Sequence, residues 1–164
     1  MRGSRPIPAL VFILGLFLVL NYVSDFKTGL PWKLIVEDPR CGHIYYDIPV
    51  RHKDVFTLSY RHSVSGSRVY GTFEITHDAH IDPLTTSYTS FGPGLPWLDA
   101  TVHYTIENGI ITVFHDVEPP RGHIRLWVSP ETGETITLNG HSYQLARFSE
   151  FPVLVEIRVN QVYD

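Results

Sequence analysis

The sequence predicts an all-β protein, an antiparallel β-sandwich or barrel-like domain, preceded by an N-terminal transmembrane helix. Three observations support this prediction. After residue 32, short runs alternate apolar and polar side chains with a period of two, which is typical of half-buried strands. Glycines and prolines separate these runs at spacings of about 8–12 residues, giving roughly nine to eleven strands. A single continuous apolar run stands near the N-terminus.

Composition limits the possible classes of protein. A length of 164 residues suits one domain, and 43% hydrophobic residues argue against wholesale disorder. The lone Cys41 excludes an intrachain disulfide framework and a cysteine-rich zinc site. The formal net charge of −4 argues against nucleic acid as a partner, because such a surface needs clustered lysines and arginines.

The N-terminal apolar run extends from Ile7 to Val23, after Arg2 and Arg5. As a helix of 17 residues it would be about 26 Å long, near the lower limit for crossing a bilayer core. Signal-peptide cleavage needs small residues at −3 and −1, and a cut after Ser24 would place Tyr22 at −3. The sequence therefore favours an uncleaved anchor over a cleaved signal peptide.

The positive residues before this run predict a cytoplasmic N-terminus and an extracytoplasmic remainder. The expected order is a signal anchor at 1–24, a linker at 25–32 and an extracytoplasmic β domain at 33–164. Without Arg2 and Arg5, the chain holds 11 basic and 17 acidic residues, a net charge of −6. We therefore expect contact with the cell membrane through residues 7–23, and no electrostatic attraction of the domain to anionic lipid.

Four alternating segments define the clearest strands. Their apolar faces are Phe56, Leu58, Tyr60, His62 and Val64; Val102, Tyr104 and Ile106; Ile124, Leu126 and Val128; and Val153, Val155, Ile157 and Val159. Asn108-Gly109 and Asn139-Gly140 predict type I′ hairpins, since both turn positions need positive φ. The first hairpin pairs Glu107 with Ile110, which places His103 opposite Phe114. Residues 131–134 predict a third, looser hairpin.

The first candidate site is the end of the strand that contains Tyr60, His62 and Ser63. A histidine beside a serine suggests a nucleophile and its base. Adjacent strand residues point to opposite faces, however, so His62 and Ser63 cannot form a catalytic pair while the strand continues. The open interpretations are a structural cap on the apolar face, a binding residue and, last, a catalytic residue.

The second candidate is the segment from Ser90 to Trp97, which holds two glycines and two prolines. Glycine supplies positive φ and proline fixes φ near −65°, so this loop should be rigid. Phe91 and Trp97 flank its centre. The loop is either a recognition surface or a corner that crosses from one sheet to the other. A glycine-rich phosphate cradle is the least favoured interpretation, because no helix start or P-loop lysine follows.

The nine histidines form the third candidate. The spacing His77-Asp78-Ala79-His80 is compatible with metal ligation on a turn, but histidines at solvated strand edges are the favoured interpretation. His103 and His115 would share a metal only after a register shift. The sequence predicts no resident metal and no cofactor, and Cys41 is expected to be a small side chain near a turn.

Two motifs resemble those of a known family. They are Phe56-x-Leu58-x-Tyr60-x-His62-Ser63-Val64, followed by Val69, and Ser90-Phe91-Gly92-x-Gly94-Leu95-Pro96. This combination resembles an uncharacterised prokaryotic domain-of-unknown-function family whose genes commonly lie beside those of TAXI-type TRAP transporters. The resemblance runs from about Lys33 to Val159. Gly71 replaces a residue that is often acidic in the family, and Pro93 stands where a small residue is usual.

That family has no established activity, so the resemblance transfers no catalytic residue. It implies a small membrane-tethered extracytoplasmic protein, accessory to a solute transporter, with TRAP membrane subunits or the solute-binding protein as partners. We expect a noncatalytic interaction protein; the alternatives are a small-ligand or metal-binding β-sandwich and, less favoured, a hydrolase using Ser63. The candidate binding residues are Tyr60, His62, Ser63, Phe91, Gly92, Gly94, Leu95, Pro96 and Trp97.

Overall fold

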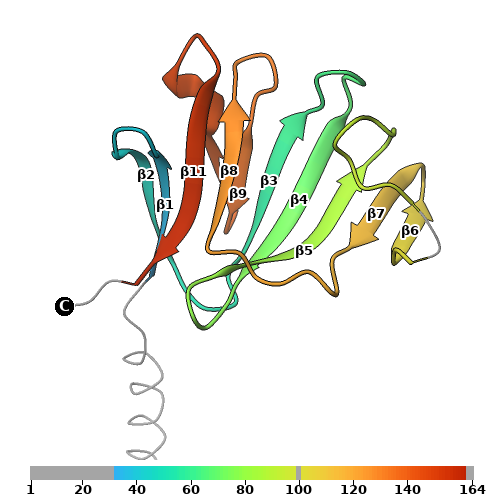
Figure 1. The fold of residues 1–164 in the computed structure, drawn as a ribbon, viewed down its shortest axis with the longest axis horizontal. Helices are drawn as coiled ribbons and strands as arrows, with labels where there is room; N and C mark the ends of the chain where they lie inside the picture. The colour runs from blue at the N-terminus through green and yellow to red at the C-terminus, as the bar shows by residue number, and fades with distance from the viewer. Residues whose placement is uncertain (1–31, 99–100, 162–164) are drawn as a thin grey trace, which may run out of the picture. The chain divides into compact units, whose positions relative to one another are not determined.

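A computed structural model describes residues 32–98 and 101–161 of the chain. Within these residues, eleven strands form two antiparallel sheets, and the only helix is one short 3-10 turn (Figure 1). The all-β prediction is therefore confirmed, with separate sheets arranged like a sandwich. The expected transmembrane helix at 1–24 lies outside the described residues. Inside them, no helix has both the length and the apolar character needed to cross a membrane.

The smaller sheet has four strands in the order β2-β1-β11-β8. Their bounds are Trp32–Asp38 for β1, His43–Val50 for β2, His123–Val128 for β8 and Val153–Asn160 for β11. The first strand therefore pairs with the last, and Val36 lies opposite Ile157.

The larger sheet has seven strands in the order β10-β9-β3-β4-β5-β7-β6. Their bounds are Val55–Arg61 for β3, Arg68–Ile75 for β4, Ile81–Tyr88 for β5, Tyr104–Glu107 for β6, Ile110–Phe114 for β7, Thr135–Leu138 for β9 and His141–Gln144 for β10. The 3-10 turn η1, Leu145–Phe148, follows β10. Asn108 and Gly109 have positive φ, as do Asn139 and Gly140, and both predicted hairpins form, the first of them in the expected register.

The main core lies between the sheets. It takes alternate residues from strands of both, including Val36, Phe56 and Ile157, none of which has exposed side-chain surface. The rings of Phe56 and Phe73 stack with centroids 5.2 Å apart. The period-two pattern arises because every second side chain meets the facing sheet and leaves water.

A second, smaller core cluster lies on β4, β5 and β7. Its buried members are Val69, Tyr88, Ile111 and Val113. No strand of the smaller sheet contributes to it. Its cover includes Leu95, Leu98 and Val102, which belong to the connection between β5 and β6 (hereafter the β5–β6 connection). A loop therefore shields this part of the larger sheet.

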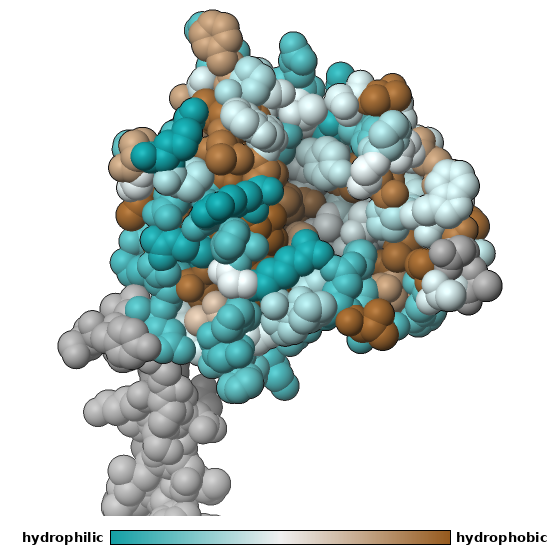
Figure 2. Space-filling view, viewed as in Figure 1, coloured by the Kyte–Doolittle hydropathy of each residue, from teal (hydrophilic) through white to brown (hydrophobic). Residues whose placement is uncertain are grey.

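Two of the predicted apolar faces include residues that are exposed in the structure. β3 ends at Arg61 and the chain turns at Ser63–Ser65, so Val64 is 72% exposed instead of packed. Tyr104 and Ile106 are also exposed, because β6 is an edge strand to which no covering element of the described chain extends. Figure 2 shows apolar side chains at the right of the molecule, where Figure 1 places β6 and β7.

One predicted connection is wrong, and one of the open interpretations is excluded. Residues 131–134 do not form a hairpin, because β8 belongs to the smaller sheet and β9 to the larger one. Conversely, the β5–β6 connection is not a corner between sheets, because both of its strands lie in the larger sheet. β7 lies between them, so this connection must pass over the inserted strand.

Candidate functional site

The two sequence motifs meet at His62, immediately after β3. The ring is buried, with 6% of the residue exposed. Its Nδ1 accepts a hydrogen bond from the Ser65 N–H at 3.2 Å, and its Nε2 lies 2.9 Å from the Pro93 carbonyl oxygen. Because Nδ1 is an acceptor, the proton resides on Nε2 and is donated to Pro93. These contacts assign one neutral tautomer and attach the β5–β6 connection to the β3–β4 hairpin.

Gly92 has a steric role at this junction. A Cβ at this position would lie 2.5 Å from His62 Cε1, well inside any normal contact distance. Glycine therefore permits the ring to approach the loop backbone. The Leu95 N–H donates to the Gly92 carbonyl at 3.2 Å, and Gly94 has φ of +82°. With Pro93 in the second position, these are the features of a type II turn.

The rest of the motif attaches the loop to the smaller core cluster. Leu95 packs against that cluster, and the Pro96 carbonyl accepts a hydrogen bond from the Tyr88 hydroxyl at 2.7 Å. Burial raises the pKa of Tyr88, so the hydroxyl remains a donor. Tyr60 packs against the same cluster. Burial raises the pKa of its hydroxyl, and the negative charge of Glu134 raises it further.

Two aromatic side chains face outward from this anchored loop. Trp97 is 77% exposed and Phe91 is 49% exposed. Their ring centroids lie 5.9 Å apart, and Phe91 also contacts Tyr88 edge-on at 5.8 Å. The loop thus displays an aromatic pair on a backbone fixed by His62 and Tyr88.

Ser63 does not join the site. It is exposed on the turn that follows β3, while His62 is buried. In the described part of the chain, no histidine or carboxylate hydrogen-bonds the Ser63 hydroxyl. Ser90, by contrast, donates to the Ser67 hydroxyl at 3.1 Å, which adds another link between the loop and the β3–β4 turn.

The other histidines lie apart from this junction. Across the described residues, no group of three or more His, Cys, Asp or Glu side chains is placed to hold a metal ion. His80 Nδ1 lies 3.2 Å from Asp78 Oδ2 on the turn after β4. His103 stacks on Phe114 with centroids 4.5 Å apart, as the predicted register requires. Cys41 is exposed and unpaired by any disulfide.

The sequence reasoning missed a polar cluster around His115. Its Nε2 lies 2.8 Å from the Thr86 hydroxyl and its Nδ1 lies 2.7 Å from Glu118 Oε1. Although burial raises it, the pKa of Glu118 is lowered overall by His115 and Arg121. The sequence feature that could have predicted this cluster is the His115-x-x-Glu118 spacing just after a strand. This spacing suits a turn that brings the two side chains together.

The residues that make these contacts lie within a region that matches a known family. The family model described as Domain of unknown function (DUF1850) matches residues 56–145. This chain belongs to that family. The matched region begins at Phe56 in β3 and includes His62, the whole Gly92–Trp97 loop and the His115 cluster. No curated protein and no solved structure matches the chain.

Proposed function

We propose that this DUF1850 protein is a membrane-anchored extracytoplasmic accessory protein of a TAXI-type TRAP solute transport system. It acts by binding a transporter component, either a membrane subunit or the solute-binding protein, and not by catalysis. The apolar run at 7–23 supports the anchor, and the resemblance of the two motifs to a family encoded beside TRAP transporters motivates the transporter association.

The observation that carries this proposal is the exposed Phe91–Trp97 pair on a loop anchored from beneath. Large aromatic side chains contribute most of the binding energy in many protein interfaces. A loop already ordered by the His62–Pro93 and Tyr88–Pro96 hydrogen bonds loses little conformational entropy when a partner binds. The pair is therefore suited to a protein contact, with His62 as a positioning residue underneath.

Co-purification tests the proposal directly. The tagged full-length chain is expressed with the transporter genes, cross-linked in intact membranes and purified. Wild-type protein should recover transporter subunits, and Trp97→Ala should recover several-fold less. Trp127→Ala is the matched control, because Trp127 is 63% exposed but lies on β8 of the other sheet.

The control variant should recover the same amount of transporter as wild type. Recovery of no transporter subunit after cross-linking would overturn the association. Equal recovery by wild type and Trp97→Ala would instead show that the aromatic pair is not the contact surface.

A further inference from the structure

Two arginines face each other at the end of the β3–β4 hairpin. Arg61 and Arg68 are direct cross-strand partners, and both are exposed. Their side chains lie on the face of the larger sheet opposite to the core, since His62 and Val69 next to them point inward. Like charges in directly opposed positions destabilise a strand pair. The arrangement therefore has an electrostatic cost in the isolated chain.

Carboxylates compensate four other arginines of the described chain but not these two. Arg40, Arg121, Arg125 and Arg158 form ion pairs with Asp38, Glu118, Glu156 and Glu37, respectively. Arg68 makes a long hydrogen bond of 3.4 Å to the Gly133 carbonyl, a neutral acceptor. Among the described residues, no carboxylate pairs with Arg61 or Arg68. Arg51 and Arg147 also form no ion pair, but among the described residues only Arg61 and Arg68 face each other across a strand pair.

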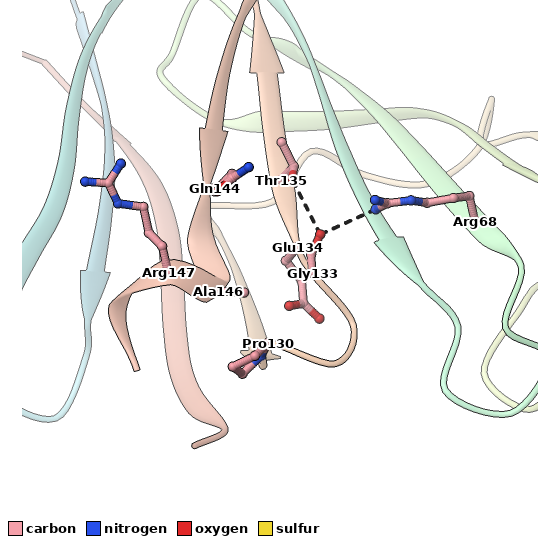
Figure 3. Close-up of a pocket in the computed structure, with 8 residues that line it drawn as sticks. All are labelled: Arg68, Pro130, Gly133, Glu134, Thr135, Gln144, Ala146 and Arg147. Carbon is pink, nitrogen blue, oxygen red and sulfur yellow. Dashed lines mark hydrogen bonds between the residues drawn. The ribbon is translucent and has the colours of Figure 1, made fainter. Parts of the chain in front are cut away.

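A polar pocket of about 310 Å³ adjoins Arg68 (Figure 3). Thr135 and Gln144 lie in its wall, and Arg147 borders it with the guanidinium directed away from Arg68. The acidic member of the lining, Glu134, points toward Pro130 (Figure 3). Its Oε2 accepts a hydrogen bond from the Ser129 N–H at 2.9 Å. The carboxylate is thus engaged elsewhere and leaves Arg68 available.

We infer that Arg61 and Arg68 form a binding site for a phosphate group. A phosphate dianion neutralises both guanidinium groups at once, whereas a single carboxylate neutralises one. The planar guanidinium also matches phosphate oxygens with two parallel hydrogen bonds. The adjoining pocket leaves room for the remainder of a small phosphate-bearing molecule, and its open face also admits a lipid headgroup.

Thermal unfolding of the full-length protein in detergent tests this site, with inorganic phosphate as the probe. Wild-type protein should gain stability with rising phosphate and then saturate, beyond the effect of chloride at equal ionic strength. Arg61→Gln and Arg68→Gln should lose that gain. In phosphate-free buffer, Arg61→Gln should melt at least as high as wild type, because one of two repelling charges is gone.

Arg51→Gln is the matched control, since Arg51 is also exposed but lies immediately after β2, in the other sheet's connection to β3. It should respond to phosphate as wild type does. The proposed site is wrong if added phosphate still stabilises both Arg61→Gln and Arg68→Gln. It is also wrong if Arg51→Gln loses the stabilisation to the same extent as they do.

Reconstituted vesicles identify the source of the phosphate. If a lipid headgroup occupies the site, phosphatidic acid, whose terminal phosphate can carry two negative charges, should stabilise the protein relative to phosphatidylcholine alone and abolish the effect of added phosphate. If the ligand is soluble, added phosphate should act equally in both membranes. In either case the effect must depend on Arg61 and Arg68, and a lack of that dependence in both arms overturns the inference.

Discussion

The two parts of the seven-stranded sheet bury their inner faces in different ways. Around β3 and β9 the cover is a second sheet, and the shared core has 15 buried residues. Around β5 and β7 the cover includes the β5–β6 connection, and the cluster below has four buried residues. The comparison shows that a loop can replace a sheet as a cover when specific polar contacts hold it in place.

Those polar contacts follow from the small size of the second cluster. Few apolar side chains are available there, so burial alone contributes less stability than it does between the sheets. His62 and Tyr88 donate to the backbone of the connection, and Gly92 allows the close approach. His62, Tyr88 and Gly92 therefore attach the loop to the sheet. This attachment is what holds Phe91 and Trp97 at the surface.

The largest effect is expected from a cavity in the main core. Phe56→Ala should lower the free energy of unfolding by about 3–5 kcal/mol, because Phe56 is fully buried and stacked on Phe73. Urea denaturation measures this value. Val55→Ala, on the exposed side of the same strand, should change it by less than about 0.5 kcal/mol. Similar losses for both variants would show that the sheets do not pack as described.

A smaller effect is expected where the loop is attached. Gly92→Ala should cost about 1–3 kcal/mol, because the new methyl group overlaps the His62 ring. The loss should shrink in a His62→Ala background, where the overlapping ring is absent. A double-mutant cycle by urea denaturation measures this coupling. Additive losses would contradict the direct contact between the two motifs.

Tyr88→Phe should have a still smaller effect. It removes only the hydroxyl that donates to Pro96, so we expect a loss of about 0.5–1.5 kcal/mol. Hydrogen exchange should increase mainly in the β5–β6 connection. Tyr104→Phe, at an exposed position on β6, serves as the control and should leave stability unchanged. Equal losses of stability in both variants would show that the Tyr88 hydroxyl does not hold the loop in place.

The smallest expected effect is on the pH dependence of stability, through Asp38, which belongs to neither core cluster. Hydrogen bonds from the Arg40 side chain and backbone lower the pKa of Asp38 to about 2 at the β1–β2 turn. A lowered carboxyl pKa stabilises the fold above the unfolded value near 4, and that contribution disappears as pH falls toward about 2. The difference in melting temperature between wild type and Asp38→Asn should therefore shrink across this range. A difference that stays constant would contradict the pairing with Arg40.

Local patterns predicted much of this fold. Alternation identified the strand that holds Phe56, and the Asn-Gly dipeptides determined two hairpins, because both depend on neighbours in sequence. The stacking of His103 on Phe114 followed from that register. The error at 131–134 has the opposite cause. A turn signal does not indicate which sheet the next strand will join.

The candidate site was predicted only as separate pieces. The sequence identified His62 and the Gly92–Trp97 loop, but not that Gly92 accommodates the His62 ring. That contact joins residues 30 positions apart and depends on how β4 and β5 return the chain to the end of β3. The opposed arginines were also missed, because the register of β3 on β4 was needed to place Arg61 opposite Arg68.

The pairing of β1 with β11 has a consequence for biosynthesis. During translation β1 emerges before every other described strand and can pair with β2, but its other edge must wait for β11, the last of them. The hairpins of the larger sheet can form while the chain is still growing, but the smaller sheet cannot be completed until the end. Contacts between distant segments also slow folding in general. The nascent domain therefore leaves one edge of β1 unpaired for most of its synthesis, a period in which a chaperone could bind that edge.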